Sequence, residues 1–419
     1  MTSVLATGLG MISPLGADCK TSFAAALAGQ SAIRRASAEL SAGLPDLLMA
    51  PAAAEPLPLL ESGYAGSDRA AQFALAAAQE AMADAGISQA PADAGRFGVF
   101  VGVGFGGAHT LDAMYARYCA TLGGDENNRR RAAVVHPLSV PRMMANAPGA
   151  LISLRYGLRG MGNTYSVACA SSAIAAGEAM RAIRHGYLDA ALVVGTEAML
   201  TPGSMVAWNA LRVMARVHAV DPAASCRPFD RARSGFVLGE GAAALVLESR
   251  VRAERRGARA RAELAGYGAS ADAGHLTQPA QAGQAAAMRQ ALAQADMEPG
   301  QIQYVNAHGT ATEVGDVVES QAIAEVFGSA SRQLAVSSTK AVHGHLIGAA
   351  GALELALAIM ALESGSIPPT AHLLDPDPRC TLDYVPLEAR HGCRIEAVMS
   401  NSFAFGGSNA CLIARRAEP

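Results

Sequence analysis

Charged and aromatic side chains are scarce in this sequence. Of its 419 residues, 16% are charged and 5% are aromatic, with a single Trp, whereas 51% are hydrophobic. We therefore expect a compact chain with a substantial core, folded as one large or two medium domains. The net charge of −3 gives no reason to expect nucleic acid or an anionic membrane as the main partner.

The sequence also lacks C-x-x-C pairs and a long apolar run, and we expect no leader. The seven cysteines are scattered and no C-x-x-C occurs, which argues against a disulfide framework or a zinc ribbon and for a reducing compartment. The first residues lack a basic region and are broken by Gly and Pro, unlike a signal peptide. No run of about 20 apolar residues is free of charges or breakers. We expect a cytoplasmic protein without a membrane span.

Predicted strands alternate with predicted helices along the whole chain. The sequence predicts strands over 2–9, 97–102, 190–195, 236–247, 303–306, 333–337 and 410–414, and helices over 20–27, 68–86, 141–154, 282–295 and 346–363. This alternation indicates α/β layers. Arginines gather over 250–261, so we place a domain boundary there, between an N-terminal half 1–249 and a C-terminal half 250–419. The stretch 36–62 has no clear period and predicts an irregular surface segment.

A cysteine stands directly before a helical pattern in the first half. Cys169 lies among small residues, and Ile174, Met180 and Ile183 give the apolar face of a helix that ends near Gly186. Unpaired N–H groups and the dipole at a helix N-terminus favour a thiolate, so Cys169 is a candidate nucleophile. The alternative is a small buried hydrophobe, as most cysteines are.

Two histidines and a run of glycines occupy loops after predicted strands. His308 and His345 are flanked by glycine, and function concentrates on such loops, although a lone histidine is often structural. The glycines between 102 and 107 do not have the G-x-G-x-x-G spacing of a dinucleotide site. We expect a tight turn or a subunit contact there.

Taken together, these loops resemble the β-ketoacyl-acyl-carrier-protein synthases. The motifs that carry the resemblance are Asn306–Thr310, Lys340 with Gly344–Gly351, Asn401–Asn409, and Arg227–Arg231 with Gly235–Gly241. They follow one another in consistent order, and the resemblance runs from about residue 2 to 414. The chain resembles the elongating Cys-His-His class rather than the initiating Cys-His-Asn class. It implies the thiolase-like fold, with two similar α/β halves in five layers.

The resemblance implies a decarboxylative Claisen condensation that yields 3-oxoacyl-carrier protein and CO₂. Cys169 would accept the acyl group, and the backbone N–H groups of Cys169 and Phe405 would form the oxyanion hole. His308 and His345 would bind the enolate oxygen as neutral Nε2–H donors. Phe405 would also gate the acyl pocket. The enzyme needs no cofactor of its own, because phosphopantetheine arrives on the carrier protein.

Further residues take supporting roles in the resemblance. Lys340 and Glu354 would share the histidine network, which agrees with the need of buried charges for a partner. Thr310 and Thr312 would hold the phosphopantetheine arm, and Phe403 would contact the substrate.

Three positions depart from the family pattern. His343 replaces a usual Thr, and a His-x-His pair near His308 could chelate a metal, but no motif supplies a further ligand and we predict no metal site. Ala404 replaces a usual Gly, whose loss is expected to stiffen the gate loop. Phe105 stands where a smaller aliphatic residue is common. We expect it to shorten or redirect the acyl pocket, the alternative being ordinary core packing.

The predicted partners are an acyl carrier protein and a second ketosynthase-like subunit. Basic residues common in the family before the helix at 68 are replaced by Gly63–Gly66, so we assign carrier docking to Arg129, Arg130 and Arg131, with the arginines of 250–261 as a second candidate. A solvated charged face is the simpler interpretation. The subunit would form a homodimer or a heterodimer.

Two other functions remain open at this point. A biosynthetic thiolase shares the fold, but the Cys-His-His set disfavours it. A non-catalytic chain-length subunit typically lacks the cysteine that is present here as Cys169. A catalytic subunit paired with such a chain-length partner is compatible with the sequence.

Overall fold

The computed structural model describes residues 2–41, 43–44, 46–57, 62–88, 90–122, 126–132 and 134–418. Within these residues, ten strands form one continuous sheet: β1 (Val4–Ile12), β4 (Phe97–Gly102), β5 (Gly162–Tyr165), β6 (Ala190–Glu197), β8 (Gly241–Ser249), β9 (Ala262–Ala271), β10 (Tyr304–Asn306), β11 (Ala335–Ser337), β12 (Ala397–Phe403) and β13 (Ser408–Arg415). A small second sheet contains β2 (Arg34–Arg35), β3 (Leu48–Ala50) and β7 (Leu238–Gly239).

The large sheet consists of two five-stranded units with the same topology. Their strand orders are β5-β4-β6-β8-β1 and β11-β10-β12-β13-β9. In both units the first three strands are parallel and the last two are antiparallel to their neighbours. A short antiparallel pairing of β1 with β9 joins them. The predicted boundary at 249/250 falls between the last strand of one unit and the first of the other, and as a domain boundary it stays a prediction.

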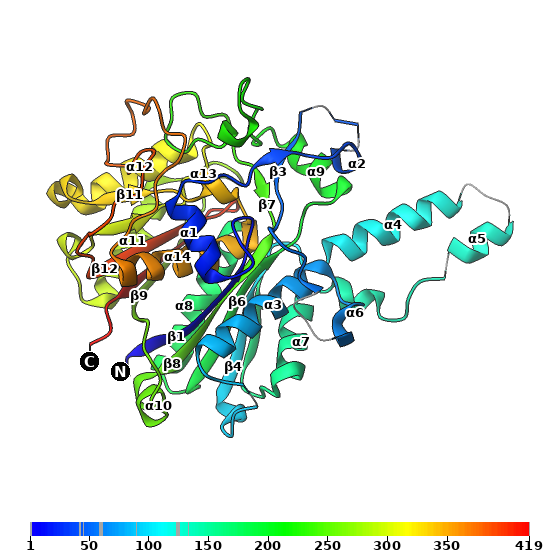
Figure 1. The fold of residues 1–419 in the computed structure, drawn as a ribbon, viewed down its shortest axis with the longest axis horizontal. Helices are drawn as coiled ribbons and strands as arrows, with labels where there is room; N and C mark the ends of the chain where they lie inside the picture. The colour runs from blue at the N-terminus through cyan, green and yellow to red at the C-terminus, as the bar shows by residue number, and fades with distance from the viewer. Residues whose placement is uncertain are drawn as a thin grey trace.

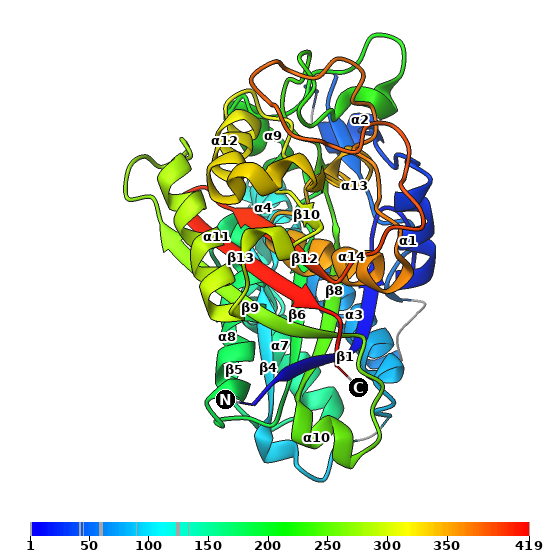
Figure 2. The ribbon, with the colours of Figure 1, turned by 90° about the vertical axis from the view of Figure 1, so that its left-hand side faces the viewer.

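Helices complete five layers, which confirms the predicted fold class (Figures 1 and 2). The outer layer of the first unit contains α3 (Arg69–Asp84) and α7 (Ala147–Tyr156), and that of the second contains α11 (Gln281–Ala295) and α12 (Gly315–Phe327). Between the two units lie α8 (Ser171–Arg184) and α14 (Ala350–Ser364). Further helices are α1 (Cys19–Leu27), α2 (Ala38–Ser41), α9 (Pro202–Ala210), α10 (Arg250–Arg255) and α13 (Lys340–His343).

Small residues allow the two central helices to touch. A Cβ on Gly351 of α14 would come within 2.7 Å of the backbone nitrogen of Ala173 on α8. Ala352 N–H donates to Ser172 Oγ at 2.9 Å across the same contact. The segment Ile347–Ser364 is long and apolar enough to cross a membrane, but 83% of it is buried inside the fold. It is therefore a core helix, at the position where the sequence predicts a helix over 346–363.

Several predicted boundaries differ from the structure. The helix expected over 141–154 is two helices, α6 (Ser139–Met143) and α7, because the chain is extended at Met144 and Pro148 restarts a helix in its first turn. The helix expected from 346 begins at Ala350 after a 3₁₀ turn. The stretch 36–62, expected to be irregular, contains α2 and β3. Residues 42, 45 and 58–61 of that stretch lie outside the described residues.

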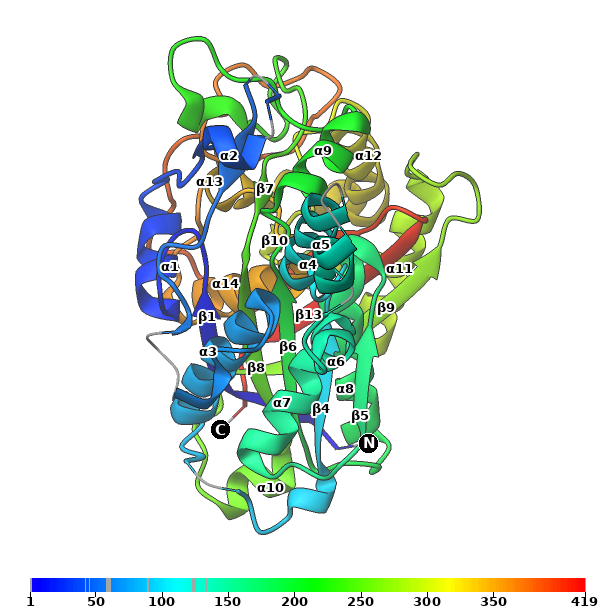
Figure 3. The same ribbon diagram turned by 90° about the vertical axis from the view of Figure 1, so that its right-hand side faces the viewer.

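An arm formed by α4 (Ala108–Leu122) and α5 (Glu126–Ala132) projects from the body of the molecule (Figure 1), and Figure 3 looks at it from its outer end. Large apolar side chains are exposed on the arm and on the segment that returns from it, namely Leu111, Tyr115, Tyr118, Leu122, Val134, Val135, Leu138 and Val140. Such a large exposed apolar surface is typical of a protein–protein interface.

Candidate active site

Cys169 lies in a 3₁₀ turn, Ala168–Ala170, between β5 and α8. The residue before it, Ala168, has φ = 46°, in the left-handed region that is costly for a residue with a Cβ. The Cys169 side chain is buried, and its Sγ lies 2.9 Å from Nε2 of His345. The strained turn thus presents the sulfur to the loop that carries the second predicted histidine.

The structure brings the three predicted reactive residues together from three loops. One side-chain donor atom each of Cys169, His308 and His345 lies within 4.8 Å of the others. The two imidazole rings are nearly perpendicular, at 82°, with centroids 5.3 Å apart. Phe236 packs edge-on against His345 and Phe403 against His308, which restricts the orientation of both rings.

Burial decides the resting protonation of this group. It lowers the pKa of His308 and of His345 well below the ordinary range, and the positive charge of Lys340 acts in the same direction, so both imidazoles are neutral. Burial also raises the pKa of Cys169 to about 12, although Lys340 and the backbone N–H of Phe405 oppose this. The expected resting thiolate is therefore wrong, because desolvation outweighs the start of α8.

Lys340 and Glu354 form an ion pair whose side chains are both fully buried. Burial raises the pKa of Glu354, and Lys340 counteracts it. This is the paired arrangement that the sequence predicts for two charges in apolar surroundings. The pair places one positive charge close enough to affect Cys169, His308 and His345 at once.

The loop between β12 and β13 carries the predicted gate. The backbone N–H of Phe405 contacts the Cys169 sulfur, where an oxyanion-hole donor is expected. The Phe405 ring stacks on Trp208, with centroids 6.4 Å apart. Gly406 and Gly407 adopt φ of 86° and 77°, so the turn depends on glycine after the gate, while Ala404 N–H is bonded to Ser408 O at 2.8 Å.

A cavity of about 940 Å³ leads to the sulfur and is lined by the three reactive residues. Thr310, Thr312 and Phe403 also line it, and the two threonine hydroxyls lie 3.0 Å apart. Their roles as substrate contacts stay predictions. Phe105 does not line this cavity. Its side chain is 64% exposed in the single chain, so the alternative of ordinary core packing is wrong.

Two buried carboxylates that the sequence did not single out hold the loops in place. Glu319 of α12 accepts hydrogen bonds from His308 N–H at 2.8 Å and Gly309 N–H at 2.7 Å. Glu197, at the end of β6, accepts from Gly104 N–H at 2.7 Å and Gly348 N–H at 3.0 Å. For Glu197 the available signal was an acidic residue inside an otherwise apolar pattern, whereas Glu319 lies among other polar residues and gave no such signal.

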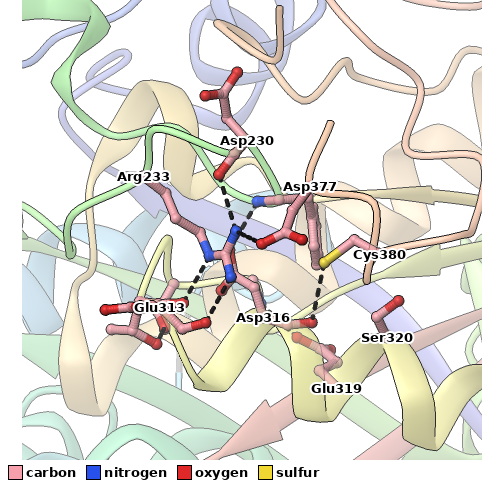
Figure 4. A network of polar contacts seen from close by, with 12 residues as sticks. Asp230, Arg233, Glu313, Asp316, Glu319, Ser320, Asp377 and Cys380 are labelled. Atoms are coloured by element: carbon pink, nitrogen blue, oxygen red, sulfur yellow. Dashed lines mark hydrogen bonds and ion pairs between the residues drawn. The ribbon is translucent and has the colours of Figure 1, made fainter. Parts of the chain in front are cut away.

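A buried arginine fixes the loop of the two threonines (Figure 4). Arg233, whose side chain is 1% exposed, donates to Thr312 O at 3.0 Å and to Asp377 Oδ2 at 2.8 Å. It also donates to the carbonyls of Glu313 and Asp230. Since these acceptors lie on separate loops, the Arg233 side chain links the loops that surround the mouth of the cavity.

The other predicted residues lie apart from this cavity. Arg129, Arg130 and Arg131 are on α5 at the outer end of the arm (Figure 1), where Arg130 pairs with Glu126 at 2.9 Å. In the second docking candidate, Arg252, Arg256 and Arg261 form ion pairs with acidic residues of the fold.

His343 is buried, but it does not join His308 and His345 as a third imidazole ligand. Its Nε2 lies 2.9 Å from Thr339 Oγ1, so its ring is directed into α13. Within the described residues, the group of donor atoms at the site is therefore Cys169, His308 and His345. The His-x-His chelate weighed from the sequence does not form.

Comparisons with known proteins find matches over nearly the whole chain. The model of the β-ketoacyl synthase N-terminal domain matches residues 1–253, and that of the C-terminal domain matches residues 261–374. The 3-oxoacyl-[acyl-carrier-protein] synthase 2 of Staphylococcus aureus (strain COL) is 38% identical, covering 99% of this chain and 98% of its own length.

Two solved structures superpose over 100% of both chains. One is a type II PKS acyl-carrier protein in complex with its ketosynthase, with a TM-score of 0.90 and 28% identity. The other is the ishigamide ketosynthase/chain length factor, with a TM-score of 0.89 and 32% identity.

Proposed function

The chain belongs to the β-ketoacyl synthase family, and from its site we propose that it is a 3-oxoacyl-acyl-carrier-protein synthase that elongates acyl chains. The observation that carries the proposal is the contact of Cys169 Sγ with His345 Nε2 at 2.9 Å, with His308 beside them. A nucleophile and two neutral imidazoles at the end of one cavity fit acyl transfer followed by enolate chemistry.

In the first step, Cys169 attacks the thioester carbonyl of an acyl-carrier protein. The S–C bond to Cys169 forms as the bond to the carrier sulfur breaks, and the thiol proton ends on the released carrier thiol. The Phe405 N–H, which contacts the sulfur, and the N–H of Cys169 would stabilise the oxyanion, each such donor being worth about 3–4 kcal/mol. The positive charge of Lys340 stabilises the thiolate as it forms.

In the second step, a malonyl-carrier protein enters the cavity and loses CO₂. His308 and His345 donate Nε2–H bonds to the thioester oxygen of the enolate that forms. Because burial keeps both imidazoles neutral, they act as donors without a change of charge. The enolate carbon attacks the acyl-Cys169 carbonyl and the bond to the Cys169 sulfur breaks. The released thiolate takes one proton from water, and the product is 3-oxoacyl-carrier protein. The residues of this chain and the phosphopantetheine group of the carrier protein suffice for these steps, so the proposal includes no cofactor.

Incubation of the protein alone with an acyl-carrier and a malonyl-carrier protein tests the proposal. Mass spectrometry of the carriers should show a product two carbons longer. Cys169→Ala should abolish it, whereas Cys119→Ala, on the exposed arm, should not. Product formation from acetyl thioesters without malonyl groups would indicate a thiolase, and the absence of any turnover with the intact chain would contradict a self-sufficient synthase.

A second subunit is part of the proposal. The exposed apolar surface of the arm and the partly exposed edge strand β5 suit a protein interface. A homodimer agrees with the family, and a heterodimer with a chain-length partner is supported by the ishigamide ketosynthase/chain length factor. Native mass spectrometry of the chain expressed alone separates the two. We propose that the exposed Phe105 faces this partner and limits acyl length there, so Phe105→Ala should lengthen the accepted chains.

We also propose that the protein is cytoplasmic. The described cysteines are all free thiols, which a reducing compartment maintains. Fluorescence microscopy of the tagged chain in its host would test this location.

A further inference from the structure

A second cavity of about 630 Å³ opens next to the mouth of the active-site cavity and shares part of its lining, including Arg216, Arg233 and Ser234. Its basic lining residues are Arg216, His218, Arg227, Arg231, Arg233 and Arg379. The acidic lining residue is Glu313. We call this second cavity the arginine pocket.

Ion pairs with aspartates neutralise part of the positive charge of the arginine pocket. Arg233 is buried and bound to Asp377, which also accepts from Arg379 at 2.7 Å. Arg231 lies 3.3 Å from Asp375, but both side chains are more than 60% exposed, and such pairs contribute little binding energy. Arg231 and Arg379 therefore still present their guanidinium groups to solvent.

Arg216 and Arg227 take no part in the ion pairs just described. In the part of the chain that the structure describes, neither has a carboxylate within ion-pair distance. Arg227 donates from Nη2 to the carbonyl of Ala232 at 3.2 Å, and its buried Nε has no hydrogen-bond partner. A buried guanidinium N–H without an acceptor is costly, and a bound anionic group would satisfy it.

We propose that the arginine pocket binds an acidic surface of the carrier protein that delivers the acyl and malonyl groups. The inference rests on the proposed function and assigns the docking site of its partner. Every carrier must bring its thioester to the neighbouring mouth, and the excess of arginines over one glutamate is complementary to an acidic surface. The buried Arg233 holds the loops that carry this charge, so the surface is preformed.

This assignment differs from docking on Arg129–Arg131. Those residues lie at the outer end of the arm and do not line either cavity of the same chain. The two surfaces therefore make opposite predictions for charge reversal.

The test compares KM for malonyl-carrier protein, malonyl-phosphopantetheine and malonyl-pantetheine in three variants. They are Arg227→Glu/Arg231→Glu, which alters residues that line only the arginine pocket, the reversal of Arg129, Arg130 and Arg131 to Glu, and the matched control Arg394→Glu, whose side chain is 90% exposed outside both cavities. Titration with unloaded holo-carrier protein gives Kd independently of turnover.

We expect the Arg227→Glu/Arg231→Glu variant to raise KM and Kd for the carrier protein by about tenfold or more at low salt, with a smaller difference at high salt. Its turnover of malonyl-pantetheine should stay within about twofold of the unaltered enzyme, which also shows that it is folded, and Arg394→Glu should change nothing.

Three results would overturn the inference: an unchanged carrier KM and Kd, an effect only in the arm variant, or an equal loss with malonyl-phosphopantetheine, which would assign the pocket to the phosphate. Lack of turnover with any substrate by the unaltered enzyme would contradict the proposed function, while the Kd comparison still decides the docking site.

Discussion

Glu319 is expected to control decarboxylation through the position of His308. Its carboxylate accepts two short bonds, from His308 N–H at 2.8 Å and Gly309 N–H at 2.7 Å, and a third from Asn401 Nδ2 at 3.3 Å. In Glu319→Gln the amide has only one oxygen, so one buried backbone N–H loses its acceptor. Such a loss costs about 1–3 kcal/mol. If this whole free-energy cost displaces His308 and so adds to the activation barrier of decarboxylation, kcat falls by roughly 5- to 150-fold.

The assay is the release of CO₂ from malonyl-carrier protein, which depends on the histidines and not on acyl transfer. Glu319→Gln should lower this kcat and leave the alkylation rate of Cys169 by iodoacetamide unchanged. Glu325→Gln is the matched control, because Glu325 lies on the same helix but is exposed and binds Arg289 and Gln281. A folded Glu319→Gln enzyme whose decarboxylation stays within about twofold of the unaltered enzyme would refute the reasoning.

Three further predictions follow from the site. Because burial raises the pKa of Cys169 to about 12, its thiolate fraction and its alkylation rate should rise about tenfold per pH unit from about pH 6 to 9, with exposed Cys119 as an accessibility reference. A plateau below pH 9 would contradict this. Lys340→Met leaves Glu354 buried without its partner and should cost about 3–5 kcal/mol in unfolding experiments, more than Lys340→Met combined with Glu354→Leu. Equal losses would show that the unpaired charge is not the cause. Ala404→Gly should speed burst acylation by freeing the gate loop, and equal bursts would exclude that role.

The sequence could predict the two histidines because each follows a strand that its apolar composition marks, whereas Cys169 was indicated by the helix after it, since β5 has no apolar pattern. Cys169, His308 and His345 come after β5, β10 and β11, and the carboxyl ends of parallel strands meet at one edge of a sheet. Much of the order of strands and helices was predictable for the same reason, but the strands β5, β9 and β12 and the helix α12 were not predicted. Their ends were less so, as Pro148 shows by restarting a helix within one apolar pattern.

The rest of the site depends on contacts without a sequence period. Glu197 binds Gly348 across 151 positions of the chain, and no local pattern encodes that distance. The protonation of Cys169 was predicted wrongly for a related reason. The start of a helix can be read from the sequence, but the burial of one sulfur depends on loops from both halves.

The repeated topology explains why the reactive pair comes from such distant parts of the chain. Cys169 follows β5 and precedes α8, and His345 follows β11 and precedes α14. In chain order, β5 and β11 are each the third strand of their unit, so the two reactive residues occupy corresponding places. The two helices pack together in the central layer, where the Ala352–Ser172 bond ties their first turns. Packing the first turns together brings the preceding loops together as well. Residues 176 positions apart therefore meet at 2.9 Å, and each half contributes a reactive group that the other lacks.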